Sequence, residues 1–125
     1  MKKKLFMFIS AFWLFCFIAS CAATPVKGIH MSRRSDVDAG VYSVTVDAFG
    51  PGEIPTVVVT GCGERNVTIE LIDLATGKII ATRKDYVPRD WVRWWYFPDL
   101  PQGSYHVILR ISDNIIGTSS FMVTK

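Results

Sequence analysis

The sequence is poor in the residues that build metal sites and disulfide frameworks. Its 125 residues contain three cysteines and two histidines, His30 and His106, which are too few for the usual zinc-binding spacings. It also contains no glycine-rich phosphate loop, no calcium-binding loop, and no Ser, His and Asp at the spacing of a catalytic motif. These absences predict a protein that is not an enzyme and that uses no metal or other cofactor.

The sequence also lacks an apolar run long enough to cross a bilayer comfortably. Its longest run extends from Leu5 to Ile18, whereas a membrane-spanning helix needs roughly 20 apolar residues. Three lysines at positions 2–4 precede this run, and small residues follow it. A basic segment, a short apolar segment and a small-residue cleavage zone are typical of a secretory signal peptide.

Ile18-Ala19-Ser20-Cys21 ends this leader and resembles the lipobox of bacterial lipoproteins, in which a peptidase cuts before the cysteine and the thiol carries lipid. The resemblance implies a lipoprotein signal peptide over residues 1–20 and membrane attachment through acyl chains on Cys21. Two or more acyl chains hold a protein stably, whereas one chain binds only marginally. Two alternatives stay open, namely ordinary signal-peptidase cleavage after Ala23 and an uncleaved anchor.

The residues after Cys21 bear on localisation through the same resemblance. Ala22 rather than Asp follows the cysteine, which in many Gram-negative lipoproteins implies transfer to the outer membrane. No run of acidic residues comes next, and such runs resemble the surface-export tags of some bacteria. The resemblance therefore implies a cell-envelope protein that is anchored at the outer membrane and faces the periplasm.

Charge argues against a nucleic-acid partner once the leader is removed. The whole chain has a formal net charge of +3, from 14 basic and 11 acidic residues. Loss of the three leader lysines leaves 11 basic residues against 11 acidic residues, and a neutral chain lacks the basic excess of a nucleic-acid binder.

Cys16 leaves with the leader and Cys21 carries lipid, so Cys62 has no partner for an intrachain disulfide and is expected to be a buried residue at a strand end.

Hydrophobic periodicity predicts an all-β domain behind a flexible segment. Residues 21–40 are rich in Ser, Arg, Asp and Gly without an apolar period, and we interpret them as a flexible tether. From Val41 onward apolar residues alternate with polar ones and turn residues separate the runs. The expected strands are residues 41–48, 54–60, 67–71, 78–84, 91–97, 105–111 and 115–123. About seven short strands predict an immunoglobulin-like antiparallel β-sandwich over residues 41–125.

The second half of the chain resembles a more specific unit. Val67–Asp73 followed by Gly77–Ile80, then Gly103-Ser104-Tyr105 and the closing Phe121–Lys125, are similar to the C-terminal sorting domains of type IX secretion. They are similar also to small exported immunoglobulin-like proteins of unknown function. A sorting domain normally ends a large secreted cargo, which the short chain ahead of this unit does not provide. The resemblance therefore favours a small stand-alone lipoprotein.

The segment Trp91–Phe97 is the candidate binding strand because six of its seven side chains are aromatic or basic. The resemblance implies that Phe97 faces the core, and alternation along a strand then turns Trp95 toward the core as well. Trp94 and Tyr96 then project from the opposite face, where three interpretations compete. A neighbouring loop covers them, a protein partner binds them, or sugar rings stack on them. The candidate binding residues are Trp91, Arg93, Trp94 and Tyr96.

The remaining titratable residues are expected to be solvated. His106 is predicted to point outward from its strand, and Asp85, Asp90 and Asp99 are predicted to be turn charges that flank the aromatic strand. The sequence thus predicts a non-catalytic, lipid-anchored envelope lipoprotein whose β-sandwich binds another envelope protein. A carbohydrate-binding accessory lipoprotein and a periplasmic inhibitor of a hydrolase are the alternatives.

Overall fold

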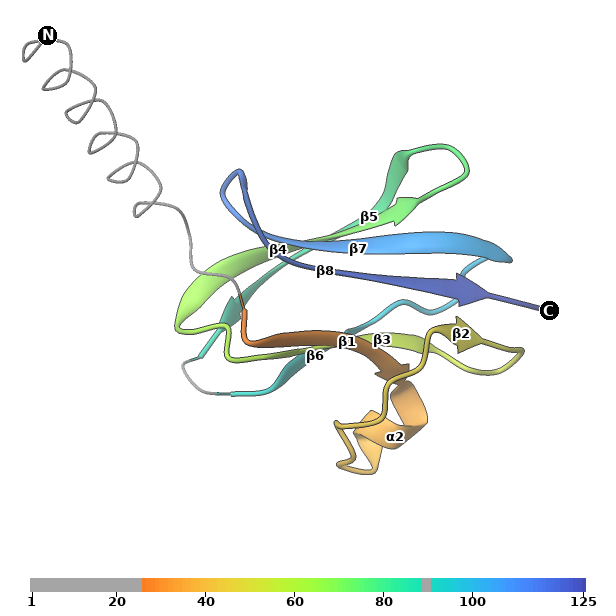
Figure 1. Ribbon diagram of the computed structural model, residues 1–125, viewed down its shortest axis with the longest axis horizontal. Coiled ribbons are helices and arrows are strands. Elements are labelled where there is room, and N and C mark those ends of the chain that lie inside the picture. Colours follow the sequence, from red (N-terminus) through yellow and green to blue (C-terminus); the bar gives the residue numbers. More distant parts are fainter. Residues whose placement is uncertain (1–25, 89–90) are drawn as a thin grey trace, which may run out of the picture.

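The computed structural model describes residues 26–88 and 91–125 as two β-sheets packed face to face (Figure 1). The predicted signal peptide, the predicted lipidation site at Cys21, and Asp90 lie outside these residues. Within the described ranges, no helix has the length and apolar character needed to cross a membrane.

The smaller sheet has three antiparallel strands in the order β1-β3-β6. These strands are β1 (Gly28–Arg33), β3 (Pro55–Thr60) and β6 (Arg93–Tyr96). The central strand β3 contains Val57, Val58 and Val59, which are all fully buried. Because β-branched residues suit a pleated surface that is covered on both faces, this strand indicates that something covers the outer face of the small sheet.

The larger sheet has five strands in the order β2-β8-β7-β4-β5. These strands are β2 (Ala48–Phe49), β4 (Arg65–Asp73), β5 (Lys78–Val87), β7 (Gly103–Ile111) and β8 (Asn114–Val123). All neighbours are antiparallel except β2, which pairs with β8 in parallel. A register shift between Leu71 and Ile72 leaves one extra residue on β5, so a β-bulge lies near the β4–β5 hairpin.

The core lies between the two sheets and follows the alternation of the strands. Its members include Met31, Val57, Ile69, Leu71, Val107, Leu109 and Phe121. Phe121 stacks on Tyr105 with ring centroids 5.3 Å apart and meets Phe49 edge-on. Cys62 is buried in this cluster as a free thiol, which confirms the expected burial, and it lies in the loop between β3 and β4.

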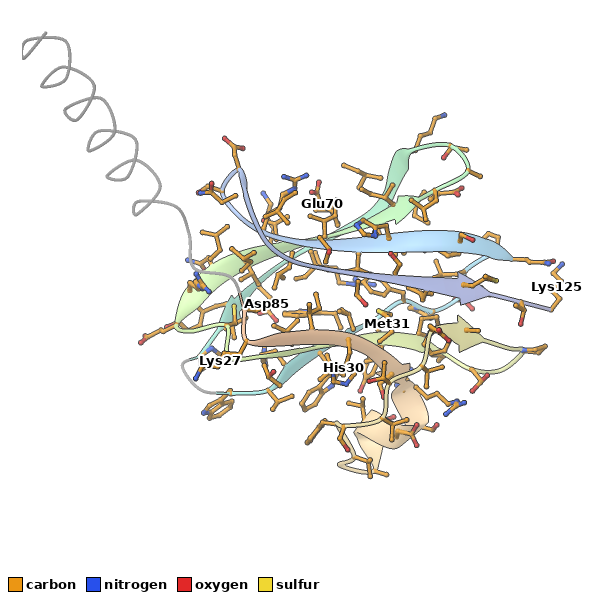
Figure 2. The ribbon with its side chains drawn as sticks, in the orientation of Figure 1. Lys27, His30, Met31, Glu70, Asp85 and Lys125 are labelled. Carbon is orange, nitrogen blue, oxygen red and sulfur yellow. The ribbon has the colours of Figure 1, made fainter. Side chains whose placement is uncertain are left out.

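The tether predicted over residues 21–40 is wrong for residues 28–38. Gly28–Arg33 forms β1, and the five residues Arg34–Asp38 form the short helix α2. Ile29 and Met31 alternate with His30 and turn toward the opposite sheet; Figure 2 shows His30 and Met31 on opposite faces of β1. The sandwich therefore begins at residue 28 rather than at residue 41.

The strand predicted over residues 41–48 is also wrong for most of its length. Residues 41–46 form no strand, and β2 begins only at Ala48. The apolar residues of this segment alternate because Tyr42, Val44 and Val46 are half-buried while their neighbours are exposed. The other six predicted strands correspond to β3 through β8.

Candidate interaction surface

The aromatic and basic side chains of β6 point alternately to the inner and the outer face of the small sheet. Trp95 pairs with Val57 and Arg93 with Val59, and both valines belong to the core. Trp94 pairs with Val58 and faces outward, in register with His30 of β1. The candidate residues therefore do not form one site, because Arg93 belongs to the inner face whereas Trp94 and Tyr96 belong to the outer face.

The outer face of the small sheet is covered by the chain segment 34–46. Tyr42 stacks on Trp94 with ring centroids 5.2 Å apart and an interplanar angle of 24°. His30 Nε2 donates to the Tyr42 carbonyl at 2.7 Å, and the Val46 amide donates to the Met31 carbonyl at 2.8 Å. Of the three interpretations of this face, the structure shows the first, in which a neighbouring segment of the chain covers Trp94 and Tyr96.

Tyr96 is held by the short helix α2. Its hydroxyl donates to Asp38 Oδ1 at 2.6 Å and accepts from Trp94 Nε1 at 3.1 Å. The Arg34 guanidinium lies 4.5 Å from the centre of the Tyr96 ring, in a cation–π contact. The Asp38 carboxylate raises the pKa of Tyr96, chiefly because the neutral hydroxyl donates the hydrogen bond to it. The outward-facing side chains of Trp94 and Tyr96 are thus linked to α2 by the cation–π contact of Arg34 and the hydrogen bond to Asp38.

The inner-face side chains of β6 contact β5, the edge strand of the large sheet. β5 and β6 belong to different sheets and do not pair, and we call the side of the sandwich where they meet the open side. Arg93 Nη2 donates to Asp85 Oδ2 at 2.7 Å, and Trp95 Nε1 donates to the same oxygen at 3.1 Å. Asp85 was predicted to be a solvated turn charge. That prediction is wrong, because Asp85 is a half-buried residue of β5 in register with the core residue Val67.

The environment of Asp85 favours its charged form. Burial acts to raise the pKa of Asp85, but hydrogen bonds from Arg93, from the Tyr86 amide and from Trp95 outweigh burial and lower it. A carboxylate that accepts several hydrogen bonds is stabilised as the anion. Asp85 therefore links the two sheets as an ionised group.

Further along the same open side lies a hollow of about 460 Å³ between β5 and the segment 97–102, and Asp73, Arg83 and Asp99 line it together with apolar side chains. Ile80, Ala81, Phe97 and Leu100 contribute apolar walls. Arg83 bridges the two strands beside it, since Arg83 Nη2 donates to the Tyr96 carbonyl at 3.4 Å. Ile80 is about half exposed and lines the hollow, so β5 presents apolar surface there. Ile79 is also about half exposed but does not line the hollow. Sequence patterning missed this surface because it depends on which strand occupies the edge.

The remaining candidate residues are dispersed. Trp91 precedes β6 and is 62% exposed. His106 points outward from β7, as predicted, and its Nδ1 lies 2.6 Å from Ser120 Oγ. Asp99 is exposed, as predicted, in the segment between β6 and β7. Within residues 26–88 and 91–125, no group of three or more His, Cys, Asp or Glu side chains is placed to hold a metal ion.

Comparisons with known proteins support the fold. No protein-family model and no curated protein matches the chain. The structure is similar to the crystal structure of an immunoglobulin-like protein from Pseudomonas aeruginosa, with a TM-score of 0.54 and 12% sequence identity. The match covers 80% of this chain and 95% of that protein. At this identity the likeness shows fold alone, and it confirms the prediction of an immunoglobulin-like β-sandwich. The lipoprotein and type IX resemblances stay predictions.

Proposed function

We propose that this protein is a lipid-anchored lipoprotein of the cell envelope, and that its sandwich is a non-catalytic module that binds another envelope protein. The observation that carries the proposal is the leader ending in Ile18-Ala19-Ser20-Cys21, followed within a few residues by the first strand at Gly28. Acyl chains on Cys21 would hold the sandwich at the membrane surface. The proposed location is the outer membrane, with the domain facing the periplasm.

The open side of the sandwich, between β5 and the segment 97–102, is the proposed contact for a protein partner. Edge strands are often protected by charged residues that point inward, and Arg83 and Asp85 have this role in the second half of β5. The first half carries the exposed apolar side chains of Ile79 and Ile80 instead. Such an edge fits an extended apolar segment of another protein, which gains backbone hydrogen bonds along the strand and a pocket for its side chains.

The covered aromatic face argues against the sugar-stacking alternative. A sugar ring stacks on an open aromatic face, but one face of Trp94 is stacked on Tyr42 and the ring of Tyr96 is covered by Arg34. Stacking of a sugar on these covered ring faces would require displacement of Tyr42 and Arg34. No described contact favours a hydrolase inhibitor, so the protein-binding role is the one that the geometry supports best.

The test is retention of a partner from detergent extracts of the envelope by the purified lipoprotein, with substitution of Ile80 by Arg. Ile80→Arg replaces an apolar wall of the hollow with a long charged side chain, so we expect loss of the retained partner. Met122→Arg is the matched control, because Met122 is also about half exposed but belongs to β8, on the other side of the large sheet. Equal retention by both variants would contradict the proposed contact.

A glycan array tests the carbohydrate-binding alternative. The double variant Trp94→Ala, Tyr96→Ala removes both outer aromatic rings, and we expect neither it nor the unmodified protein to retain a glycan. Retention by the unmodified protein that the double variant loses would favour the carbohydrate-binding alternative. A β-rich circular dichroism spectrum of the double variant is the control for folding.

A further inference from the structure

One end of the sandwich is defined by the entering chain. The Val26 amide donates to the Ile116 carbonyl at 2.9 Å, and the Lys27 side chain lies against Gly61. The β3–β4 loop, the last residues of β5, the first residues of β6 and the β7–β8 hairpin lie at this same end (Figure 1). Figure 2 shows Lys27 and Asp85 near this end and Lys125 at the opposite end. We call this the N-terminal end of the sandwich.

The length of chain before Val26 limits how an anchored sandwich sits on a membrane. Four residues separate Cys21 from Val26, so the two Cα atoms are at most about 18 Å apart even when the link is fully extended. The ten residues of β8 span about 33 Å. Because the link is shorter than the sandwich is long, it cannot pass along the domain and bring the opposite end to the bilayer.

The side chains at the N-terminal end suit a membrane interface. Trp91 is 62% exposed and Tyr86 is 43% exposed, and these two are the only exposed aromatic residues in the part of the chain that the structure describes. Trp and Tyr favour the boundary between headgroups and acyl chains, because their rings are apolar and each carries a polar group. Ile115, in the β7–β8 hairpin of the same end, is also about half exposed, and the stem of Lys27 can extend along such a boundary.

The charged residues of this end have both signs. Lys27 is basic, whereas Glu64 and Asp113 are acidic and exposed. Glu64 accepts a hydrogen bond from the Tyr86 hydroxyl. Contact with the bilayer would therefore depend on the aromatic side chains rather than on attraction to anionic headgroups, and it would vary little with salt concentration.

We infer that the N-terminal end of the sandwich is a membrane-contact surface, and that Trp91 inserts into the headgroup region of the bilayer that holds the acyl chains of Cys21. The inference rests on the proposed function, because the short link acts only if Cys21 is acylated. It extends that function by specifying which end of the sandwich faces the bilayer. The open side that carries Ile79 and Ile80 is then left accessible to a partner in the periplasm.

Quenching of tryptophan fluorescence by brominated lipids tests the orientation. The mature acylated protein, with its mass checked for acyl chains, is placed in phosphatidylcholine vesicles whose acyl chains are brominated near the headgroup. Its tryptophans are Trp91, Trp94 and Trp95, and only Trp91 is exposed. We expect quenching of the unmodified protein, unchanged by a rise in salt, and loss of that quenching in Trp91→Phe.

The matched control places a tryptophan at the other end. Leu74 is exposed in the β4–β5 hairpin, so Leu74→Trp in the Trp91→Phe background should show no quenching. Equal quenching at both positions, or none at Trp91 in acylated protein, would overturn the orientation while leaving the lipoprotein assignment intact. Absence of acyl chains on Cys21 would contradict the proposed function and, with it, the orientation that rests on it.

Discussion

Asp85 of β5 accepts a hydrogen bond from Arg93 of β6 at a distance of 2.7 Å, and these two strands belong to different sheets. The pair therefore joins the two layers at the side where no backbone ladder closes them. Trp95 donates to the same carboxylate oxygen. One acidic side chain thus positions both inward-facing residues of the strand that the sequence singled out for binding.

Substitution of Asp85 by Asn should lower the free energy of unfolding by about 1 kcal/mol, because it removes the charged partner of a guanidinium that is only partly exposed to solvent. Urea unfolding followed by circular dichroism measures the change. Asp99→Asn is the matched control, because Asp99 is an exposed residue of a connecting segment, and we expect it to change stability by less than about 0.5 kcal/mol. Equal effects at the two positions would contradict the structural role of Asp85.

The contribution of Asp85 should also depend on pH. Its pKa is lowered in the folded protein, so its stabilisation is complete above the unfolded pKa of about 3.9 and is lost as pH falls through the lower folded value. The difference in unfolding free energy between the unmodified protein and Asp85→Asn should be constant at neutral pH and narrow below about pH 4. The lowered pKa of Glu53, from the Gly50 amide and Arg33, is common to both proteins and cancels. A difference that does not change with pH would be inconsistent with an ionised Asp85.

The segment that covers the small sheet should contribute to stability through Val37 of α2. Val37 is 2% exposed, whereas Val41 in the same segment is 42% exposed. Val37→Ala should cost about 1–3 kcal/mol from lost apolar burial, and Val41→Ala should cost less than about 0.5 kcal/mol. Urea unfolding compares the two. A Val37→Ala variant as stable as Val41→Ala would show that α2 does not pack on the sheet in solution.

Removal of the Tyr105 hydroxyl should destabilise the sandwich. Tyr105 is buried in the core, and its hydroxyl donates to the Pro101 carbonyl at 2.5 Å, which fixes the turn that leads into β7. Tyr105→Phe should lower the unfolding free energy by about 1 kcal/mol. Tyr86→Phe is the control, because the Tyr86 hydroxyl meets Glu64 at the exposed surface, and such contacts contribute little. Thermal unfolding of both variants separates the two cases, and a larger loss for Tyr86→Phe would contradict the assignment.

The fold was largely predictable because most strands have strong alternation bounded by turn residues. Val67, Ile69 and Leu71 alternate with polar residues, and the pattern specifies both the strand and its core face. The first strand was missed because Gly28–Arg33 contains only Ile29 and Met31 as apolar signals, next to basic and serine residues typical of linkers. A short strand of this kind is stabilised by its pairing with β3, which local sequence does not reveal.

The candidate site was predictable only in part. Alternation along β6 correctly separated Trp95 and Phe97 from Trp94 and Tyr96. It could not predict that Tyr42 stacks on Trp94, because the alternation of residues 41–48 has the same period as a strand. Nor could it identify Asp85 as the partner of Arg93, since that contact depends on how the edge strands of two sheets meet.

The mature N-terminus provides the most direct test of a lipid-anchored sandwich. Intact mass spectrometry of the protein purified from membranes should find a chain that begins at Cys21 and carries the mass of several acyl chains. A chain that retains residues 1–20, or one that begins at Thr24 without added lipid, would contradict the lipoprotein assignment.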